Sequence, residues 1–338
     1  MTVPVAGRHV AIPLQLSATH MRPPGGSIVC SLGGATMGTG WSVQAAVPPG
    51  TDTASLQADI EAVLDLVIAQ MSNWEKDSLV SRFNHAAEGE IISLPDELHQ
   101  VMRCALRVAQ ETDGAYDPAM GALVDLWGFG PAPRRTTPPD ARLITEAMRP
   151  GGWKQLSLSD DRTLRQPGGL SLDLSSIAKG FAVDLVAHRL RANNIRHFLV
   201  EIGGELYGAG VKPNGSPWWV AVDHASRLAT PIPQHAPIVI ALHELAVATS
   251  GMERCFTHEG RTYAHTINPL TGYPVDNEIV ATTVLRPSCM EADAYATALL
   301  VMGTTKALEF AGAHHIAAFI LDDRGKLHIS PAMAAMLD

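Results

Sequence analysis

The stretch from Leu170 to Asp184, LSLDLSSIAKGFAVD, places the strongest constraint on what this chain can form. Over residues 170–174 leucines alternate with polar residues, which predicts a strand. Ser175 and Ser176 are favourable N-cap residues, and the apolar stripe at helical spacing that follows them predicts a helix. A strand that runs into a helix leaves the first backbone N–H groups of the helix unpaired, and such groups suit a phosphate.

Lys179 and Gly180 strengthen the phosphate interpretation of this junction. A lysine in the first turn opposes the helix dipole, so an anion bound there would explain its presence. Gly180 would allow a ligand to come close to the backbone. An ordinary strand-to-helix junction with a solvated lysine is the alternative that these residues leave open.

Composition and charge exclude several classes of protein. The chain has 338 residues, of which 46% are hydrophobic, and this is ample for a globular core. A formal net charge of −9 without any cluster of Lys and Arg argues against a nucleic-acid or anionic-membrane partner. No stretch approaches the roughly eighteen apolar residues of a membrane helix.

The N-terminal segment and the cysteines bear on where the protein works. Residues 1–26 contain no uninterrupted apolar region typical of an export signal, and we expect them to form a flexible lead. The four cysteines show neither CxxC nor metal-finger spacing, which favours isolated reduced thiols. We therefore expect a cytoplasmic protein.

Asp293 and Thr297 are candidate metal ligands. They lie four residues apart in a helix predicted over 291–303, so they share one face, and their neighbours are apolar. A carboxylate and a hydroxyl in such surroundings suit a hard cation such as Mg²⁺. The alternative is an aspartate favoured by the helix dipole and a threonine bonded to its own backbone.

Four further residues stand in segments that favour a ligand. His265 lies among turn formers and is a candidate general base, although a structural histidine is the alternative. Asp117 either bonds its own turn or binds a ligand hydroxyl or amine. Trp74 either closes the edge of the core or stacks on a ring, and Met37 lies in a glycine-rich turn over 33–40 that forms a hairpin or a lid.

Short motifs follow one another in a defined order from residue 31 to residue 321. They are GATMGT at 34–39, MS at 71–72 with Asn84, DGAYDP at 113–118, LWGFG at 126–130, DL at 173–174 with KG at 179–180 and Asp184, IGG at 202–204, ATSG at 248–251, His265 with PLTGYP at 269–274, and EADA at 291–294 with Thr297. In this order they resemble the ApbE family, whose members are FAD:protein FMN transferases.

The resemblance implies a fold and an activity. The fold would be α+β, with mixed sheets flanked by helices around a single flavin-binding cleft, in a domain over residues 27–330. The activity would be Mg²⁺-dependent transfer of FMN from FAD to a Ser or Thr hydroxyl of an acceptor protein, through a phosphodiester bond and with release of AMP. FAD and an acceptor with a Ser/Thr flavinylation motif are then the expected partners. A FAD-binding or storage protein, or a Mg²⁺-dependent FAD pyrophosphatase giving FMN and AMP, is the alternative.

The resemblance also implies roles for single residues. The family's FAD contacts correspond to Met37, Trp74, Ala115, Tyr116, Asp117, Asp173, Lys179 and Ile267. Its metal ligands correspond to the backbone carbonyl of Ser176 and the side chains of Asp293 and Thr297, and its base to His265. Asn268 departs from the family pattern, in which Asp usually precedes the proline, so a charge near the base is missing.

Overall fold

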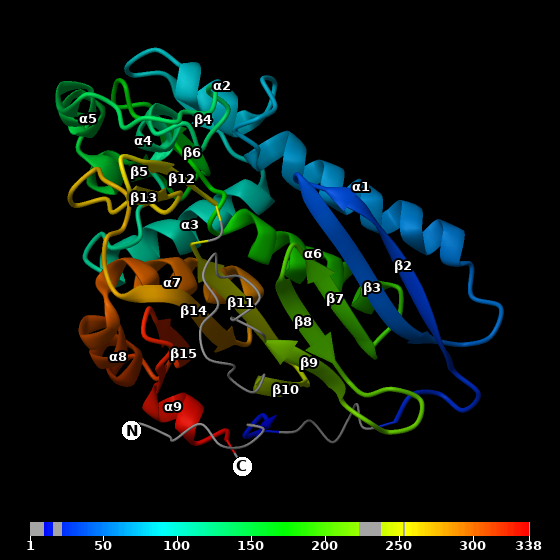
Figure 1. Cartoon of the computed structure of the whole chain (residues 1–338). Helices are drawn as coiled ribbons and strands as arrows, with labels where there is room; N and C mark the ends of the chain where they lie inside the picture. Colours follow the sequence, from blue (N-terminus) through cyan, green and yellow to red (C-terminus); the bar gives the residue numbers. More distant parts are fainter. Residues whose placement is uncertain (1–9, 16–21, 223–237, 253, 338) are drawn as a thin grey trace.

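The computed structural model describes residues 10–15, 22–222, 238–252 and 254–337 (Figure 1). Its helices are α1 (Thr53–Met71), α2 (Leu79–His85), α3 (Asp96–Glu111), α4 (Gly121–Leu126), α5 (Ala141–Met148), the 3₁₀ turn η2 (Gly152–Gln155), α6 (Ala178–Ala192), α7 (Cys289–Met302), α8 (Thr304–Ala313) and α9 (Pro331–Ala334). Its strands are β1 (Val10–Ala11), β2 (Ile28–Thr36), β3 (Thr39–Val47), β4 (Ile91–Ser93), β5 (Ser157–Leu158), β6 (Thr163–Arg165), β7 (Phe198–Ile202), β8 (Glu205–Ala209), β9 (Trp218–Val222), β10 (Ile238–Leu242), β11 (Leu245–Gly251), β12 (Cys255–His258), β13 (Arg261–Ala264), β14 (Ile279–Arg286), β15 (Ala317–Asp322) and β16 (Leu327–Ile329).

An eight-stranded sheet in the order β16-β15-β14-β11-β8-β7-β3-β2 forms the centre of the molecule. Every neighbouring pair in it is antiparallel. A smaller sheet, β1-β10-β9, is mixed, because β1 runs parallel to β10 while β9 runs antiparallel to it. The large sheet is antiparallel rather than built from parallel β-α-β units, so the predicted α+β class is confirmed.

Helices cover one face of the large sheet and the small sheet covers the other. α1, α6 and α7 pack on the first face, and their buried side chains form the main hydrophobic core (Figure 1). A second core lies between the large sheet, the small sheet and α9. The remaining short elements, including α4, α5 and the β12–β13 hairpin, form a lobe beside α3 and α7.

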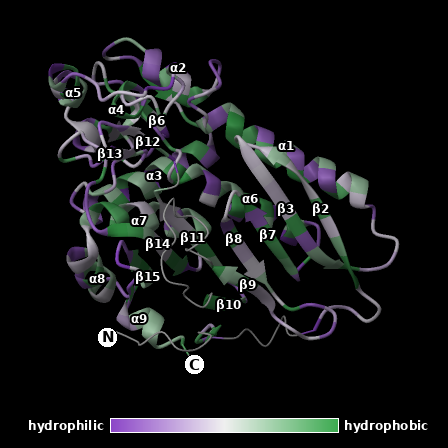
Figure 2. Cartoon of the chain, in the orientation of Figure 1, coloured by the Kyte–Doolittle hydropathy of each residue, from purple (hydrophilic) through white to green (hydrophobic). Residues whose placement is uncertain are grey.

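The long helices form where the apolar spacing predicts them. In α1 the stripe from Leu56 to Met71 is buried, and the Asp52 side chain accepts hydrogen bonds from the first backbone N–H groups. Figure 2 shows both hydrophobic and hydrophilic residues along α1, as a helix with one face on the core requires. Among the described residues, no helix has the length and apolar character needed to cross a bilayer.

The predicted strand over residues 170–174 is wrong. This segment is buried but pairs with no strand in the described chain; instead, amide side chains bind its backbone. Asn84 accepts a hydrogen bond from the Leu172 N–H at 2.7 Å and donates to the Leu172 carbonyl at 3.0 Å. Gln166 does the same for the Leu170 N–H and carbonyl at 3.3 and 3.0 Å. Backbone groups of Pro118 and Gly121 bond Asp173 and Ser171 in between. Alternating leucines therefore mark burial, while side-chain amides and loop backbone take the place of partner strands.

Replacing Asn84 by alanine is expected to lower the free energy of unfolding by about 1–3 kcal/mol, because the Leu172 N–H and carbonyl would both lose their partner. Asn193→Ala is the matched control, since Asn193 is exposed and its side-chain amide bonds the exposed Asp59 carboxylate instead of buried backbone groups. Urea denaturation measures both variants. Equal stability of the two would show that water replaces the Asn84 amide without cost.

The β2–β3 hairpin also differs from the prediction. Its strands pair as far as Thr36 and Thr39, so the turn is only Met37-Gly38, and both residues have positive φ. The glycines before them belong to β2. Position 34 favours glycine, because a Cβ there would lie only 2.8 Å from Nε1 of Trp41.

Part of the predicted N-terminal lead is described. Val10 and Ala11 form β1, and Ala11 is buried against the small sheet. Residues 1–9 and 16–21 lie outside the described residues. The sequence also predicts a strand around residues 218–223, and its last residue, Asp223, lies outside the described residues as well. The boundary between a lead and a domain at residue 27 stays a prediction. The four cysteines are all free thiols, as predicted.

Candidate functional site

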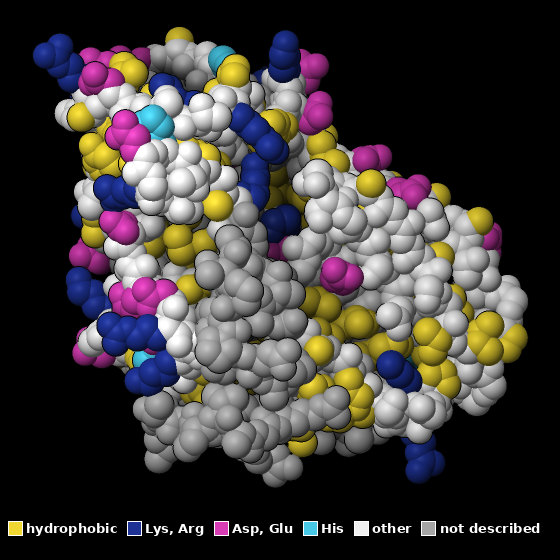
Figure 3. Space-filling model, viewed as in Figure 1, with side chains coloured by type: hydrophobic (Ala, Val, Ile, Leu, Met, Phe, Trp, Pro, Cys, Tyr) yellow, Lys and Arg dark blue, Asp and Glu magenta, His cyan; other side chains and the backbone are white. Residues whose placement is uncertain are grey.

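A cleft of about 380 Å³ lies where the amino ends of α6 and α7 meet the ends of β7, β8 and β11. Figure 3 shows a hollow lined by Lys and Arg side chains between the lobe with β12 and β13 and the half of the molecule with α1 and α6. The cleft is lined by Ala115, Tyr116, Asp117, Met120, Val124, Phe129, Asp173, Ser175, Ser176, Lys179, Gly203, Glu205, Thr249, Ser250, Gly251, Arg254, His265, Thr266, Ile267, Pro269, Asp293 and Thr297.

Two aspartates link the amino ends of α6 and α7. Asp184 of α6 accepts hydrogen bonds from the Cys289 and Met290 N–H groups, at 2.8 and 3.0 Å, and so caps α7. In return, Asp293 of α7 accepts a hydrogen bond from the Gly180 N–H of α6 at 3.1 Å. Each helix therefore supplies a carboxylate to the unpaired N–H groups of the other, which fixes where Asp293 stands in the cleft.

The start of α6 differs from the prediction. The helix begins at Ala178 after Ile177, and neither Ser175 nor Ser176 caps it. Asp173 accepts the Ser175 N–H in a tight turn at 2.7 Å, which turns the chain before the helix starts. The cap comes from Asp293, 113 residues along the chain, so local sequence gives no sign of it.

Three charged side chains meet in the cleft: the buried carboxylates of Glu205 and Asp293, and Lys179, whose side chain is 29% exposed. The Lys179 ammonium donates to Glu205 Oε1 at 2.5 Å, and Asp293 is buried beside them. Burial lowers the pKa of Lys179, but Asp293 and Glu205 outweigh it and raise that pKa above its ordinary value. Burial raises the pKa of Glu205 to about 7 against the effect of Lys179, and burial also raises the pKa of Asp293.

Oxygen atoms suited to a hard cation face this charge cluster. Asp293 and Thr297 both line the cleft from one face of α7, as their spacing predicted, and the Thr297 hydroxyl contacts the Ser250 hydroxyl at 2.9 Å. Ser176 lines the cleft opposite them. Within the described chain, no three His, Cys, Asp or Glu side chains form a metal cluster. A carboxylate, hydroxyls and a backbone carbonyl are the donors that Mg²⁺ accepts while it keeps several waters, so the residues present fit this ion.

His265 follows β13 and lies on the wall of the cleft. Its backbone N–H donates to the Arg254 carbonyl at 2.9 Å, and its ring Nδ1 lies 3.2 Å from the same oxygen. Because a carbonyl oxygen only accepts, Nδ1 carries the proton and Nε2 carries the lone pair. The imidazole is therefore held as the tautomer that accepts a proton at Nε2.

Asp117 builds the opposite wall. Its Oδ1 accepts the Ala119 N–H at 2.7 Å and its Oδ2 accepts the Trp153 N–H at 3.1 Å, which is the turn-bonding alternative left open by the sequence. Burial raises the pKa of Asp117. The side chain lines the cleft as well, so its structural role leaves room for a ligand contact.

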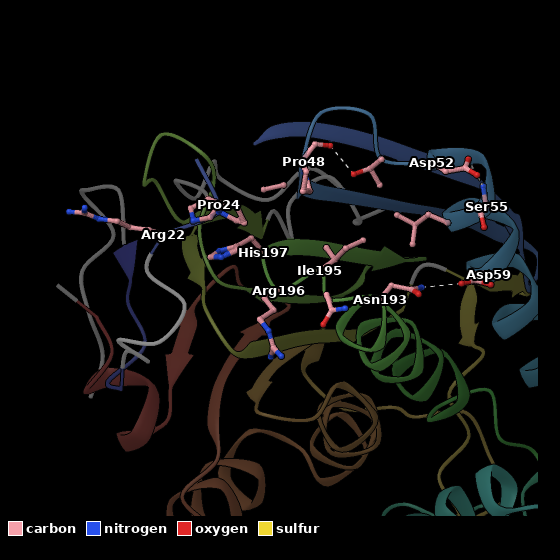
Figure 4. Close-up of a pocket in the computed structure, with 15 residues that line it drawn as sticks. Arg22, Pro24, Pro48, Asp52, Ser55, Asp59, Asn193, Ile195, Arg196 and His197 are labelled. Atoms are coloured by element: carbon pink, nitrogen blue, oxygen red, sulfur yellow. Dashed lines mark hydrogen bonds between the residues drawn. The ribbon is translucent and has the colours of Figure 1, made fainter. Parts of the chain in front are cut away.

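A larger cavity, of about 710 Å³, lies at the other end of β7 (Figure 4). It contains none of the predicted site residues, and its polar groups bind one another. Asn193 donates to Asp59 at 3.0 Å, and the Asp52 side chain caps α1. The buried charges and the histidine converge only in the smaller cleft, which is therefore the candidate site.

A model of the ApbE family matches residues 37–320. The chain belongs to the ApbE family. It is 36% identical over 311 residues to the FAD:protein FMN transferase of Vibrio cholerae, covering 90% of this chain and 92% of the relative. It is also 36% identical to that of Haemophilus influenzae, covering 92% and 90% of the two chains. Among solved structures, flavinyl transferase ApbE of Pseudomonas stutzeri superposes with a TM-score of 0.84 at 35% identity, covering 92% of this chain and 97% of that one.

Ten of the twelve predicted site residues line the cleft of this ApbE-family chain, and two do not. Met37 lies in the β2–β3 turn and packs against the main core, while Trp74 follows α1 with 57% of its surface exposed. Neither belongs to the cleft lining, so their contact with FAD stays a prediction.

Several residues of the ApbE-family cleft have no predicted role. Glu205, Ser250 and Arg254 line it together with the predicted residues. Glu205 follows two glycines at the end of a strand, and a carboxylate at such a turn is the only local signal. Its partner Lys179 is 26 residues away, so the pairing is visible only in the fold.

Proposed function

We propose that this chain transfers FMN from FAD to a Ser or Thr hydroxyl of an acceptor protein, forming a phosphodiester bond and releasing AMP. The observation that carries the proposal is the convergence of four separate stretches, 115–117, 173–179, 265–267 and 293–297, on one cleft. Between them they supply a base, a buried cation and the oxygen donors of a metal site. The names of the relatives reported above support the same reaction.

Asp293, Thr297 and the Ser176 carbonyl would hold Mg²⁺ in this cleft. When bound, the ion would withdraw charge from the pyrophosphate of FAD. The chain adds a positive charge of its own, since the partly exposed Lys179 side chain lines the same cleft and its ammonium would attract phosphate oxygens. Asp293 keeps its place because the Gly180 N–H binds one of its oxygens.

His265 would remove the proton from the acceptor hydroxyl. Nε2 accepts this proton as the hydroxyl oxygen bonds to the phosphorus of the FMN half, and the bond from that phosphorus to the AMP oxygen breaks. The Arg254 carbonyl supports this role, because it binds Nδ1–H and stabilises the protonated ring that forms.

Asn268 does not weigh against transfer. Its Oδ1 accepts the Leu270 N–H at 2.9 Å, and its backbone N–H and carbonyl bond Tyr273 and Gly272 across the turn. An aspartate would build the same turn, so the substitution keeps the local geometry next to His265. The turn at Asn268 therefore gives no reason to prefer FAD storage over transfer.

The test incubates the full chain with FAD, Mg²⁺ and a candidate acceptor protein, and follows the acceptor by intact mass and AMP by chromatography. A mass gain equal to FMN less water, with one AMP per acceptor, is the expected result. AMP and free FMN without a mass gain would replace transfer by hydrolysis. If FAD stayed intact in the presence of an acceptor that a relative flavinylates, transfer and hydrolysis would both be refuted, and FAD binding would be the remaining function.

Replacing His265 by glutamine is expected to lower the rate of FMN transfer by about 10²–10⁴-fold, because the proton acceptor at Nε2 is lost. FAD binding, measured by flavin fluorescence, should be nearly unchanged. His258→Gln on the same hairpin is the matched control, because His258 is not part of the cleft lining. A His265 variant as active as this control would refute the role of base.

A further inference from the structure

Glu205 is a buried carboxylate in the cleft that the proposed reaction does not use. It opens β8 directly after the Gly203-Gly204 turn, and its side chain is only 3% exposed. Oε1 accepts the hydrogen bond from Lys179, while Oε2 is buried with no hydrogen-bond partner among the described residues. A half-satisfied buried carboxylate costs stability, so its presence calls for a function.

Lys179 stands between two carboxylates and pairs with one of them. In the described chain its ammonium forms an ion pair with Glu205, and no ion pair within 4.0 Å joins it to Asp293. Yet Asp293 is buried in the same cleft and packs closely against Gly180, the residue that follows Lys179. Asp293 meanwhile directs one oxygen to the Gly180 N–H.

Without Glu205 this arrangement would change. A buried ammonium needs a carboxylate partner, and a lysine on its flexible stem can turn to the next one available. That carboxylate is Asp293, whose oxygens would then be taken up by Lys179. The group around Lys179 would also lose one of its two carboxylates, leaving a neutral Lys179–Asp293 pair that attracts a cation less.

We propose that Glu205 is a positioning residue, which holds the Lys179 ammonium so that the Asp293 carboxylate stays available to a divalent cation. The inference rests on the proposed function through its metal site. The Glu205–Lys179 contact would therefore support two kinds of binding. It keeps Asp293 available to the metal ion, and it keeps the Lys179 ammonium facing the cleft, where it can bind phosphate.

The test measures Mn²⁺ binding to the full chain without FAD, by electron paramagnetic resonance of the free ion. Glu205→Gln is expected to weaken Mn²⁺ binding by about tenfold or more, the size of effect that one nearby charge has on a carboxylate. Glu205→Asp keeps the charge but is one methylene shorter, and it should weaken binding similarly because the contact with Lys179 is lost. Adding Lys179→Met to Glu205→Gln should restore most of the affinity.

Glu244→Gln is the matched control, because it breaks an ion pair with Arg191 outside the cleft and should leave Mn²⁺ affinity unchanged. Circular dichroism confirms that each variant is folded. Wild-type affinity in Glu205→Gln, or in Glu205→Asp, would overturn the inference while the metal site stands. Absence of Mn²⁺ binding by the unmodified chain would instead remove the metal assignment, and this inference with it.

Discussion

Replacing Gly180 by alanine is expected to lower the free energy of unfolding by about 1–3 kcal/mol and to reduce FMN transfer by about 10²-fold. A Cβ at this position would lie 2.4 Å from the Cys289 carbonyl oxygen and 2.9 Å from Cβ of Asp293. The two helices would have to move apart, and the hydrogen bond from the Gly180 N–H to Asp293 would stretch or break. In an isolated helix, replacing glycine by alanine would stabilise the helix by about 1 kcal/mol. Packing between α6 and α7 alone therefore makes the expected effect on stability unfavourable.

Gly312→Ala in α8 is the matched control. Gly312 also lies in a helix, but a Cβ there would meet only Pro331 at an ordinary contact distance of 3.8 Å. We expect this variant to be as stable as the unmodified chain or slightly more stable, with unchanged activity. Thermal and urea denaturation give the stabilities, and AMP release gives the rates. If the two variants behaved alike, the close approach of α6 and α7 would not govern the position of Asp293.

The parts of the fold that the sequence predicts are those set by neighbours along the chain. The apolar stripes of α1 and α3 are buried as their spacing indicates, and β14 spans the β-branched run at 279–285. α7 places Asp293 and Thr297 on one face because helical geometry alone requires it. These features need no knowledge of the rest of the molecule.

The errors arise where a distant segment replaces a local partner. The segment at 170–174 has the alternation of a strand, but the Asn84 and Gln166 amides occupy its backbone groups. Ser175 and Ser176 are residue types that commonly cap helices, but here the Asp293 side chain of α7 accepts the Gly180 N–H in the first turn of α6. Asn84 lies 88 residues from Leu172 and Asp293 lies 113 residues from Gly180, so no local pattern reports these two hydrogen bonds, although Gln166 is only four residues from Leu170.

The candidate site was predicted through the order of its motifs more than through any single residue. His265, Lys179 and Asp293 each have an ordinary structural explanation in sequence, and it is their convergence on one cleft that supports the proposed roles. Glu205 shows the limit of this approach. A carboxylate after a turn is common, and its meaning depends on the lysine that it meets in the fold.

Replacing Asp293 by asparagine should separate its hydrogen bond to the Gly180 N–H of α6 from its proposed role as a metal ligand. The amide oxygen can still accept the Gly180 N–H, and the buried charge, whose pKa burial raises, is removed. The free energy of unfolding should therefore change by less than about 1 kcal/mol. FMN transfer should fall by about 10³-fold, since a bound metal ion contributes several kcal/mol to the transition state.

Asp293→Ala removes both tasks and provides the comparison. It should lose activity to the same extent, and it should also lose about 1 kcal/mol of stability, because the Gly180 N–H is left without its cap. Urea denaturation and Mg²⁺-dependent AMP release measure the two effects on the same samples. If Asp293→Asn kept activity within tenfold of the unmodified chain, Asp293 would be a helix cap alone and the metal would need other ligands. A loss of activity with stability retained in Asp293→Asn would mean instead that the carboxylate has two functions. One oxygen bonds the Gly180 N–H and so holds α6 against α7, while the other is available to bind the metal ion.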